Sequence, residues 1–105
     1  MLVKKLTCAM GKYENFHFSV TIKCEELFML AALRGLACEC QPQINRRIAL
    51  AGARNDKWKR NKGFATFYFT STSNRAEFLR EATLLFATGW KKIDRKDEKA
   101  APRQN

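Results

Sequence analysis

The stretch RNDKWKRNKGFATFYFTS, residues 54–71, joins a basic segment directly to an aromatic one. Its first half, residues 54–62, carries five cations against one acid, with Trp58 among them. The cations are Arg54, Lys57, Lys59, Arg60 and Lys62. Its second half is rich in aromatic and β-branched residues, which favour a strand with one buried face. The stretch therefore predicts a basic loop that leads into a β-strand over residues 64–70.

A second strand is predicted over residues 16–22, where apolar and polar residues alternate. Because alternate side chains point to opposite faces of a sheet, the two strands together define a buried face and an open face. The buried face is expected to hold Phe16, Phe18, Val20, Ile22, Ala65, Phe67 and Phe69. The open face is expected to hold His17, Ser19, Thr21, Phe64, Thr66, Tyr68 and Thr70. Residues 1–9 alternate more weakly and predict a short edge strand.

Helical periodicity appears in three other segments. Residues 24–36 carry an apolar stripe, and Gly35 is expected near its end. Residues 42–52 begin with a proline and have Ile44, Ile48 and Ala51 at helical spacing, although a strand over 47–53 is the competing interpretation. Asn74 is expected to cap a third helix, with Glu77 completing a capping box.

Gly89 is expected to end this third helix before a short strand over residues 90–93. The order of elements predicts one α+β domain, residues 1–93, in which two or three helices pack on one face of a small antiparallel sheet. Residues 94–105 mix charges with alanine, proline and glutamine and predict a disordered charged tail.

Net charge is the unusual feature of the composition. The 105 residues include 20 Lys and Arg against 10 Asp and Glu, which gives a formal charge of +10. Residues 94–105 contribute four cations and three acids, so about nine of these charges belong to the rest of the chain. A positive field of this size attracts polyanions and speeds their association.

The cysteines predict neither a metal site nor a disulfide framework. Cys8, Cys24, Cys38 and Cys40 lack the C-x2-C or C-x4-C spacing of zinc sites, and His17 is the only histidine. The longest apolar run, residues 27–33, has seven residues and is too short to span a bilayer. We therefore expect a cytoplasmic protein with reduced thiols, without cofactor, metal or membrane segment.

The leading functional hypothesis is non-enzymatic nucleic-acid binding. The basic loop supplies groups for phosphates, and the rings of Phe64 and Tyr68 would stack on bases, which favours a single strand. Trp58 belongs to the same expected surface.

Residues 62–69, KGFATFYF, resemble the central motif of the RRM family, which has the form K/R-G-F/Y-G/A-F-V-x-F/Y. The first four positions and the last agree, whereas Thr66 occupies the position of a stacking aromatic residue and Phe67 that of the valine. The resemblance implies a ferredoxin-like sheet, with a strand where residues 42–52 predict a helix.

A winged helix-turn-helix is another alternative. In that arrangement residues 42–51 would form the recognition helix, with Arg46 and Arg47 facing duplex DNA, and residues 56–62 would form the wing. Arg46 and Arg47 are therefore also candidate nucleic-acid contacts.

Two further functions remain open from the sequence. The protein could be a small interaction module or inhibitor, of the kind carried by mobile elements, that docks its basic face on a larger complex or on an acidic protein surface. A small basic ribonuclease, using Tyr68 with Arg60 and Lys62, is the enzymatic alternative. No phosphate-binding loop, metalloprotease motif or nucleophile motif accompanies these residues.

Overall fold

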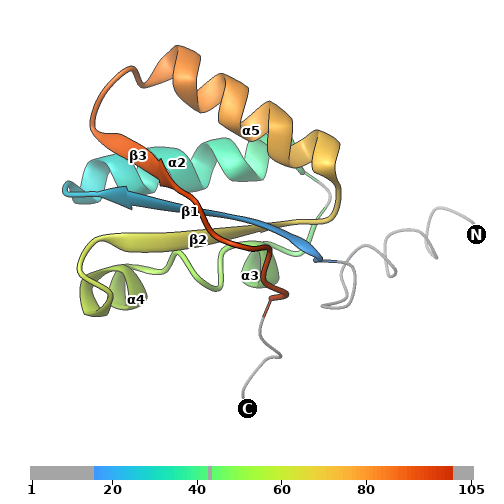
Figure 1. Ribbon diagram of the computed structural model, residues 1–105, viewed down its shortest axis with the longest axis horizontal. Helices are drawn as coiled ribbons and strands as arrows, with labels where there is room; N and C mark the ends of the chain where they lie inside the picture. The colour runs from blue at the N-terminus through green and yellow to red at the C-terminus, as the bar shows by residue number, and fades with distance from the viewer. Residues whose placement is uncertain (1–15, 43, 101–105) are drawn as a thin grey trace, which may run out of the picture.

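The computed structural model describes residues 16–42 and 44–100, which form a three-stranded antiparallel sheet and four helices (Figure 1). The strands are β1 (Phe18–Cys24), β2 (Phe64–Phe69) and β3 (Trp90–Ile93), in the spatial order β2-β1-β3. The helices are α2 (Leu27–Cys40), α3 (Arg46–Ala49), α4 (Asn55–Arg60) and α5 (Thr72–Leu85). The predicted α+β class is confirmed. The edge strand predicted over residues 1–9 lies outside the described residues.

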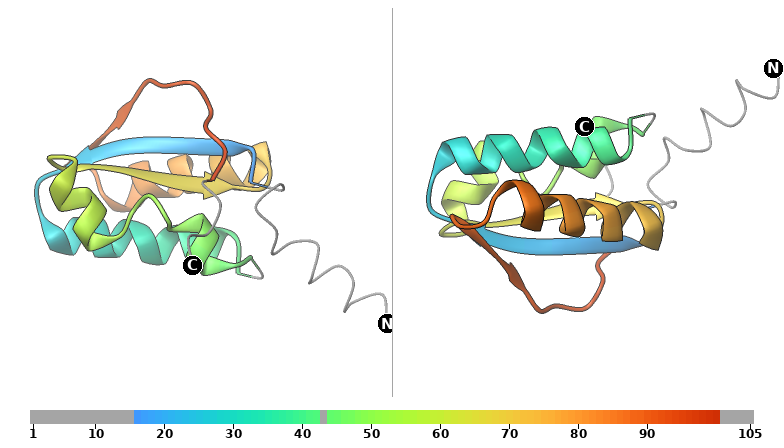
Figure 2. Two further views of the ribbon diagram at one scale, coloured as in Figure 1. Left: turned by 90° about the horizontal axis from the view of Figure 1, so that it is seen from below. Right: turned by 90° about the horizontal axis from the view of Figure 1, so that it is seen from above.

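The two long helices α2 and α5 lie on one side of the sheet, and the chain after β3 crosses the other side (Figure 2). The main core fills the space between sheet and helices. At its centre the ring of Phe78 on α5 lies 5.2 Å from that of Phe67 and 5.3 Å from that of Phe69, and all three rings are fully buried. Each such ring pair contributes about 0.5–1.5 kcal/mol beyond its buried area. The predicted burial of this face of β2 is confirmed, and it fixes α5 against the sheet.

The first predicted strand needs a correction at its beginning. β1 starts at Phe18 and continues to Cys24, so Phe16 precedes the strand. Phe16 is buried in a second cluster with Ile48 and Tyr68 at the edge of the sheet, and not beneath the helices as predicted. The alternating pattern of residues 16–22 therefore does not predict the packing partners of Phe16, because this residue lies outside the strand.

The helices differ from the prediction in their ends. α2 continues to Cys40, so Gly35 lies inside the helix and does not end it. α5 begins at Thr72, and its cap is Ser71, whose hydroxyl accepts a hydrogen bond from the Asn74 N–H at 3.0 Å. The predicted cap at Asn74 is wrong because serine offers the same interaction one turn earlier.

The segment between α2 and β2 departs most from expectation. The helix predicted over residues 42–52 is reduced to the four residues of α3, and the strand considered over 47–53 is reduced to a single bridge between Gly52 and Thr66. The predicted basic loop instead contains the helix α4. Neither the winged helix-turn-helix nor the RRM arrangement is confirmed. Within the described residues between α2 and β2, the structure has no helix long enough to serve as a recognition helix and no strand where the RRM has its second one.

Residues 94–100, which the sequence assigns to a disordered tail, have no helix or strand but contact the body of the protein. The Asp97 carboxylate pairs with Arg75 of α5 and accepts a hydrogen bond from the Ser19 N–H at 3.2 Å. Ala100 is buried in the second cluster. Across residues 16–42 and 44–100, no helix is long and apolar enough to cross a membrane.

Candidate functional site

Trp58 fixes the basic helix α4 to the sheet. Its indole N–H donates a hydrogen bond of 3.0 Å to the carbonyl oxygen of Cys24, the last residue of β1. The ring is half-buried and packs against the main core. Trp58 is one of the predicted nucleic-acid contacts, and the structure shows that its half-buried ring also ties α4 to β1. The cations around it are held at a defined place because their helix is anchored.

The turn from α4 into β2 brings the end of the helix beside the first residue of the strand. Lys62 and Gly63 have φ values of +59° and +96°, so the chain reverses in two residues. The Gly63 N–H donates to the Trp58 carbonyl at 2.9 Å, and the Gly63 carbonyl accepts from the Cys24 N–H at 3.0 Å. Glycine is required here because a Cβ would lie 2.9 Å from the Cys24 carbonyl oxygen.

This turn forms one wall of a shallow pocket of about 370 Å³. The pocket is lined by Arg60, Asn61, Lys62, Phe64, Thr66 and Arg95. These residues come from α4, the turn, β2 and the segment after β3. Three of them are cations and none carries a carboxylate, so the pocket suits an anion. Its volume lies within the range of about 300–1,000 Å³ that small ligands occupy in proteins. We call it the Phe64 pocket.

The Phe64 ring is half-buried and already has two cationic neighbours. The Lys23 ammonium lies 5.6 Å and the Arg95 guanidinium 5.8 Å from the ring centroid. Lys23 is the cross-strand partner of Phe64 in the pairing of β1 with β2. At such exposed sites a cation–π contact contributes about 0.5–1 kcal/mol. A base stacked on an aromatic ring contributes about 1–3 kcal/mol. Because this exceeds the energy of one cation–π contact, a base that displaces Lys23 or Arg95 from the Phe64 ring gains binding energy.

The acids near the pocket form weak surface pairs. The Asp56 carboxylate lies 3.1 Å from the guanidinium of Arg54 and 3.2 Å from that of Arg60, and all three side chains are exposed. Desolvation raises the pKa of Asp56, but Arg54, backbone N–H groups and Arg60 outweigh it and hold that pKa below its ordinary value. Arg95 is 4.0 Å from Glu98. Exposed pairs of this kind contribute about 0–1 kcal/mol, so Arg60 and Arg95 can turn to a phosphate at little cost.

Tyr68 does not belong to this site. The sequence places it correctly on the face opposite Phe67, yet it is only 8% exposed and packs with Phe16, Ile48 and Ala49. Burial, and then the nearby Glu98 carboxylate, raise the pKa of its phenol. The prediction of an exposed Tyr68 ring is wrong because the segment around α3 wraps the outer edge of β2 and covers it.

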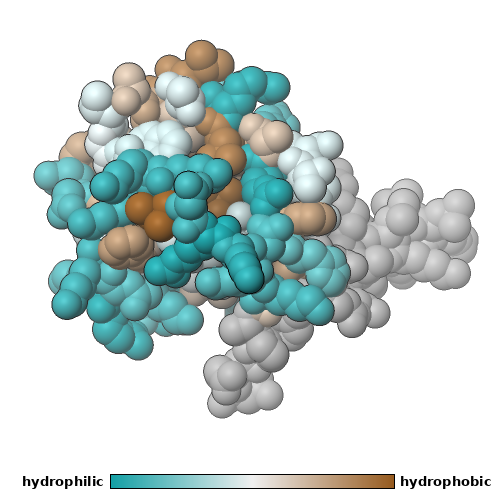
Figure 3. All heavy atoms as spheres, viewed as in Figure 1, coloured by the Kyte–Doolittle hydropathy of each residue, from teal (hydrophilic) through white to brown (hydrophobic). Residues whose placement is uncertain are grey.

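The other predicted cations lie outside the Phe64 pocket. Arg46 and Arg47 are exposed on α3, and Figure 1 shows this helix farther along β2 than α4. Arg54 occupies the position before the first residue of α4 and makes no capping hydrogen bond, while Lys57 and Lys59 belong to the body of that helix. Hydrophilic side chains cover α4 and the face crossed by the chain after β3 (Figure 3). These cations do not line the pocket, but they add to the positive electrostatic potential around it.

Four lining or neighbouring residues were not among the predicted site residues: Lys23, Asn61, Thr66 and Arg95. Thr66 was expected on the open face of the sheet, but not as a contact residue. Lys23 continues the open-face alternation of Ser19 and Thr21, so extending the predicted strand by one residue would have identified it. Arg95 belongs to the predicted tail, and no local pattern indicates that it returns to β2.

No metal site emerges among the residues that the structure describes, since no group of three His, Cys, Asp or Glu side chains comes together there. Cys24, Cys38 and Cys40 are free thiols. Comparison of the chain with protein-family models, with curated proteins and with solved structures found no match.

Proposed function

We propose that the protein binds single-stranded nucleic acid, without enzymatic activity, at the Phe64 pocket. The observation that carries the proposal is the lining of this pocket, which joins an accessible aromatic ring to three cations and no carboxylate. A backbone phosphate would be held by Arg60, Lys62 and Arg95, and the neighbouring base would stack on Phe64. The Asn61 amide and the Thr66 hydroxyl supply additional polar contacts.

Two features support a single strand over a duplex. A stacking ring inside a pocket is accessible only to an unpaired base. In addition, α3 has four residues and is about 6 Å long, which is too short to read a major groove.

The test is fluorescence anisotropy with labelled single-stranded and duplex oligonucleotides, DNA and RNA, over a series of salt concentrations. Lys62→Ala and Arg95→Ala should each weaken binding to every sequence and reduce the magnitude of the salt slope by about 0.7 for a single strand. Phe64→Leu keeps an apolar side chain but removes the stacking ring. It should weaken single-strand binding about 5- to 150-fold and leave the salt slope unchanged.

The matched control is Lys59→Ala, which removes an exposed cation of α4 that lies close to Lys62 in the sequence but does not line the pocket. It should change affinity less than Lys62→Ala does. Equal losses for these two variants would show that binding follows net charge alone and would remove the pocket from the proposal. Absence of binding at low salt would reject the proposal altogether.

A second candidate is an interaction module that docks through an apolar surface, and not through the basic face expected from the sequence, and one observation favours it. Four large apolar side chains are exposed at the end of the helical layer where α2 begins and α5 ends: Leu27, Phe28, Leu84 and Leu85. Hydrophobic surface is visible over the end of α5 in Figure 3. Exposed apolar patches commonly mark protein–protein contacts. If no oligonucleotide binds, a lysate pull-down should recover one stoichiometric protein, and the double variant Phe28→Ser, Leu84→Ser should lose it.

A further inference from the structure

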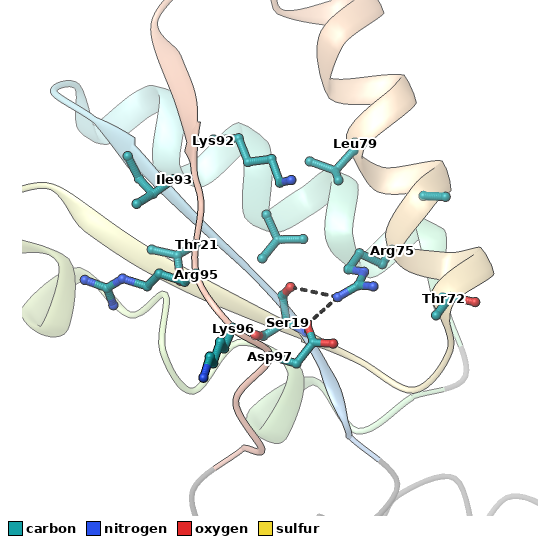
Figure 4. A pocket seen from close by; sticks show the side chains of 12 residues that line it. Ser19, Thr21, Thr72, Arg75, Leu79, Lys92, Ile93, Arg95, Lys96 and Asp97 are labelled. Atoms are coloured by element: carbon teal, nitrogen blue, oxygen red, sulfur yellow. Dashed lines mark hydrogen bonds and ion pairs between the residues drawn. The ribbon is translucent and has the colours of Figure 1, made fainter.

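A second and larger pocket, of about 620 Å³, opens between α5, β1 and the chain from β3 onward (Figure 4). It lies where β1 extends beyond the end of β3, since β3 pairs only with residues 21–24. We call it the Leu79 pocket. None of its residues was predicted as a functional residue.

The Leu79 pocket combines apolar surface with four cations and one acid, and two of these charged groups form a fixed ion pair. Val20, Leu79 and Ile93 supply apolar surface. At one end the Arg75 guanidinium donates to the Ser19 carbonyl at 3.3 Å and pairs with the Asp97 carboxylate. The pocket therefore has a hydrogen-bond donor, the guanidinium, beside an acceptor, the carboxylate, and both adjoin an apolar surface. In Figure 4 the Lys92 side chain reaches toward Leu79 across the opening.

The two pockets adjoin each other through Arg95, which lines both. Figure 4 shows its side chain turned away from α5, toward the side of β2. The strands between the pockets are also tied together, because the hydroxyls of Thr21 and Thr66 are 2.9 Å apart. Thr21 lines the Leu79 pocket and Thr66 lines the Phe64 pocket. A bound chain can therefore pass from one pocket to the other over Arg95.

We infer that the Leu79 pocket is a second nucleotide subsite, which receives the base next to the one stacked on Phe64, with the linking phosphate held by Arg95. This inference rests on the proposed function and extends it. The Asp97 carboxylate disfavours a phosphate at the Arg75 end of the Leu79 pocket, and a neutral base fits the apolar surface there. The other cations of the lining, Lys92, Arg95 and Lys96, are available to the phosphates on either side of that base. Carboxylates accept hydrogen bonds from the exocyclic amino groups of bases, so Asp97 would favour a base that carries one.

The test fills the pocket without removing a charge. Ala76 is an exposed residue of α5 that lines the pocket, so Ala76→Phe should place a ring inside it. The matched control is Ala31→Phe, at an exposed position of α2 outside both pockets. With a single-stranded octanucleotide, Ala76→Phe should weaken binding at least fivefold with an unchanged salt slope, and Ala31→Phe should not. The methyl NMR signals of Leu79 and Ile93 should shift when the octanucleotide is added to the wild type.

The outcomes separate the inference from the proposed function. If Lys62→Ala weakens octanucleotide binding while Ala76→Phe behaves like Ala31→Phe, and the Leu79 and Ile93 methyl signals stay in place, the second subsite is refuted and the Phe64 pocket stands. If the wild type binds no octanucleotide at low salt, both are refuted. A loss for Ala76→Phe together with shifted methyl signals supports the second subsite.

Discussion

Replacing Gly63 by alanine should destabilise the fold through the turn that positions Lys62 and Phe64. Gly63 has a φ of +96°, which lies outside the usual range of residues with a side chain. Its added Cβ would lie 2.9 Å from the Cys24 carbonyl oxygen, a backbone atom of β1. The same oxygen accepts the Trp58 indole hydrogen bond, so any shift that relieves the contact also disturbs the anchor of α4.

The expected loss is about 2 kcal/mol in the free energy of unfolding. The left-handed backbone costs an alanine about 1–2 kcal/mol. Disturbing the indole hydrogen bond adds about 0.5–1.5 kcal/mol. The smaller entropy of the unfolded alanine chain offsets about 0.4–1 kcal/mol of this. For a chain of this length, a change of 2 kcal/mol corresponds to a fall of about 8–16 °C in Tm.

Urea unfolding followed by circular dichroism at 25 °C measures the change, with Gly35→Ala as the control. Gly35 lies inside α2, and a Cβ there meets no atom within 4 Å. The same substitution should therefore stabilise the protein by about 0.5–1 kcal/mol, since glycine is a poor helix former. A Gly63→Ala variant within 0.5 kcal/mol of the wild type, or an equal loss in both variants, would refute the reasoning.

Three other predictions concern single groups in the core and at its edge. Trp58→Phe removes the donor to the Cys24 carbonyl and should lower the free energy of unfolding in urea by about 1–2 kcal/mol; an unchanged value would contradict the anchoring role. Thr21→Val leaves the Thr66 hydroxyl without its 2.9 Å partner and should lower the free energy of unfolding by about 1–2 kcal/mol. Adding Thr66→Val should restore most of this loss. Additive effects of the two substitutions in a double-mutant cycle would contradict the pairing. Burial raises the pKa of the Cys40 thiol from 9.0 to about 11, so the thiol loses its proton at a lower pH in the unfolded chain than in the folded protein. The free energy of unfolding should therefore fall as the pH rises from about 9 to about 11. Cys40→Ala should make this fall shallower when the free energy of unfolding is measured in urea at each pH. An equal pH dependence in the variant and the wild type would contradict the role given to Cys40.

The sequence predicted the sheet better than the segments around it. The burial of Phe67 and Phe69 followed from strict alternation, and this set the face on which α5 packs. The helix α4 was missed because residues 55–60 have no apolar stripe. Its stability comes from Trp58, which bonds to a distant strand, from Asp56 in the first turn and from cations in the last turn.

The candidate site was predicted only where its residues are close in sequence. Arg60, Lys62 and Phe64 come together because one turn joins α4 to β2. Arg95 reaches them through contacts of the segment after β3 with β1 and α5, and a local pattern carries no information on such contacts. The burial of Tyr68 likewise depends on α3, which meets it across the edge of β2.

The Ser19 amide offers a natural reporter of whether residues 94–100 stay attached. Its N–H donates a hydrogen bond to the carboxylate of Asp97 and not to a neighbouring strand. Asp97→Asn weakens that acceptor, so the Ser19 proton should exchange with deuterium faster, while the Val20 amide, in the middle of β1, should keep its rate. One peptide proton would then measure, in the intact molecule, how often the last part of the chain leaves the sheet and whether an oligonucleotide holds it in place or expels it.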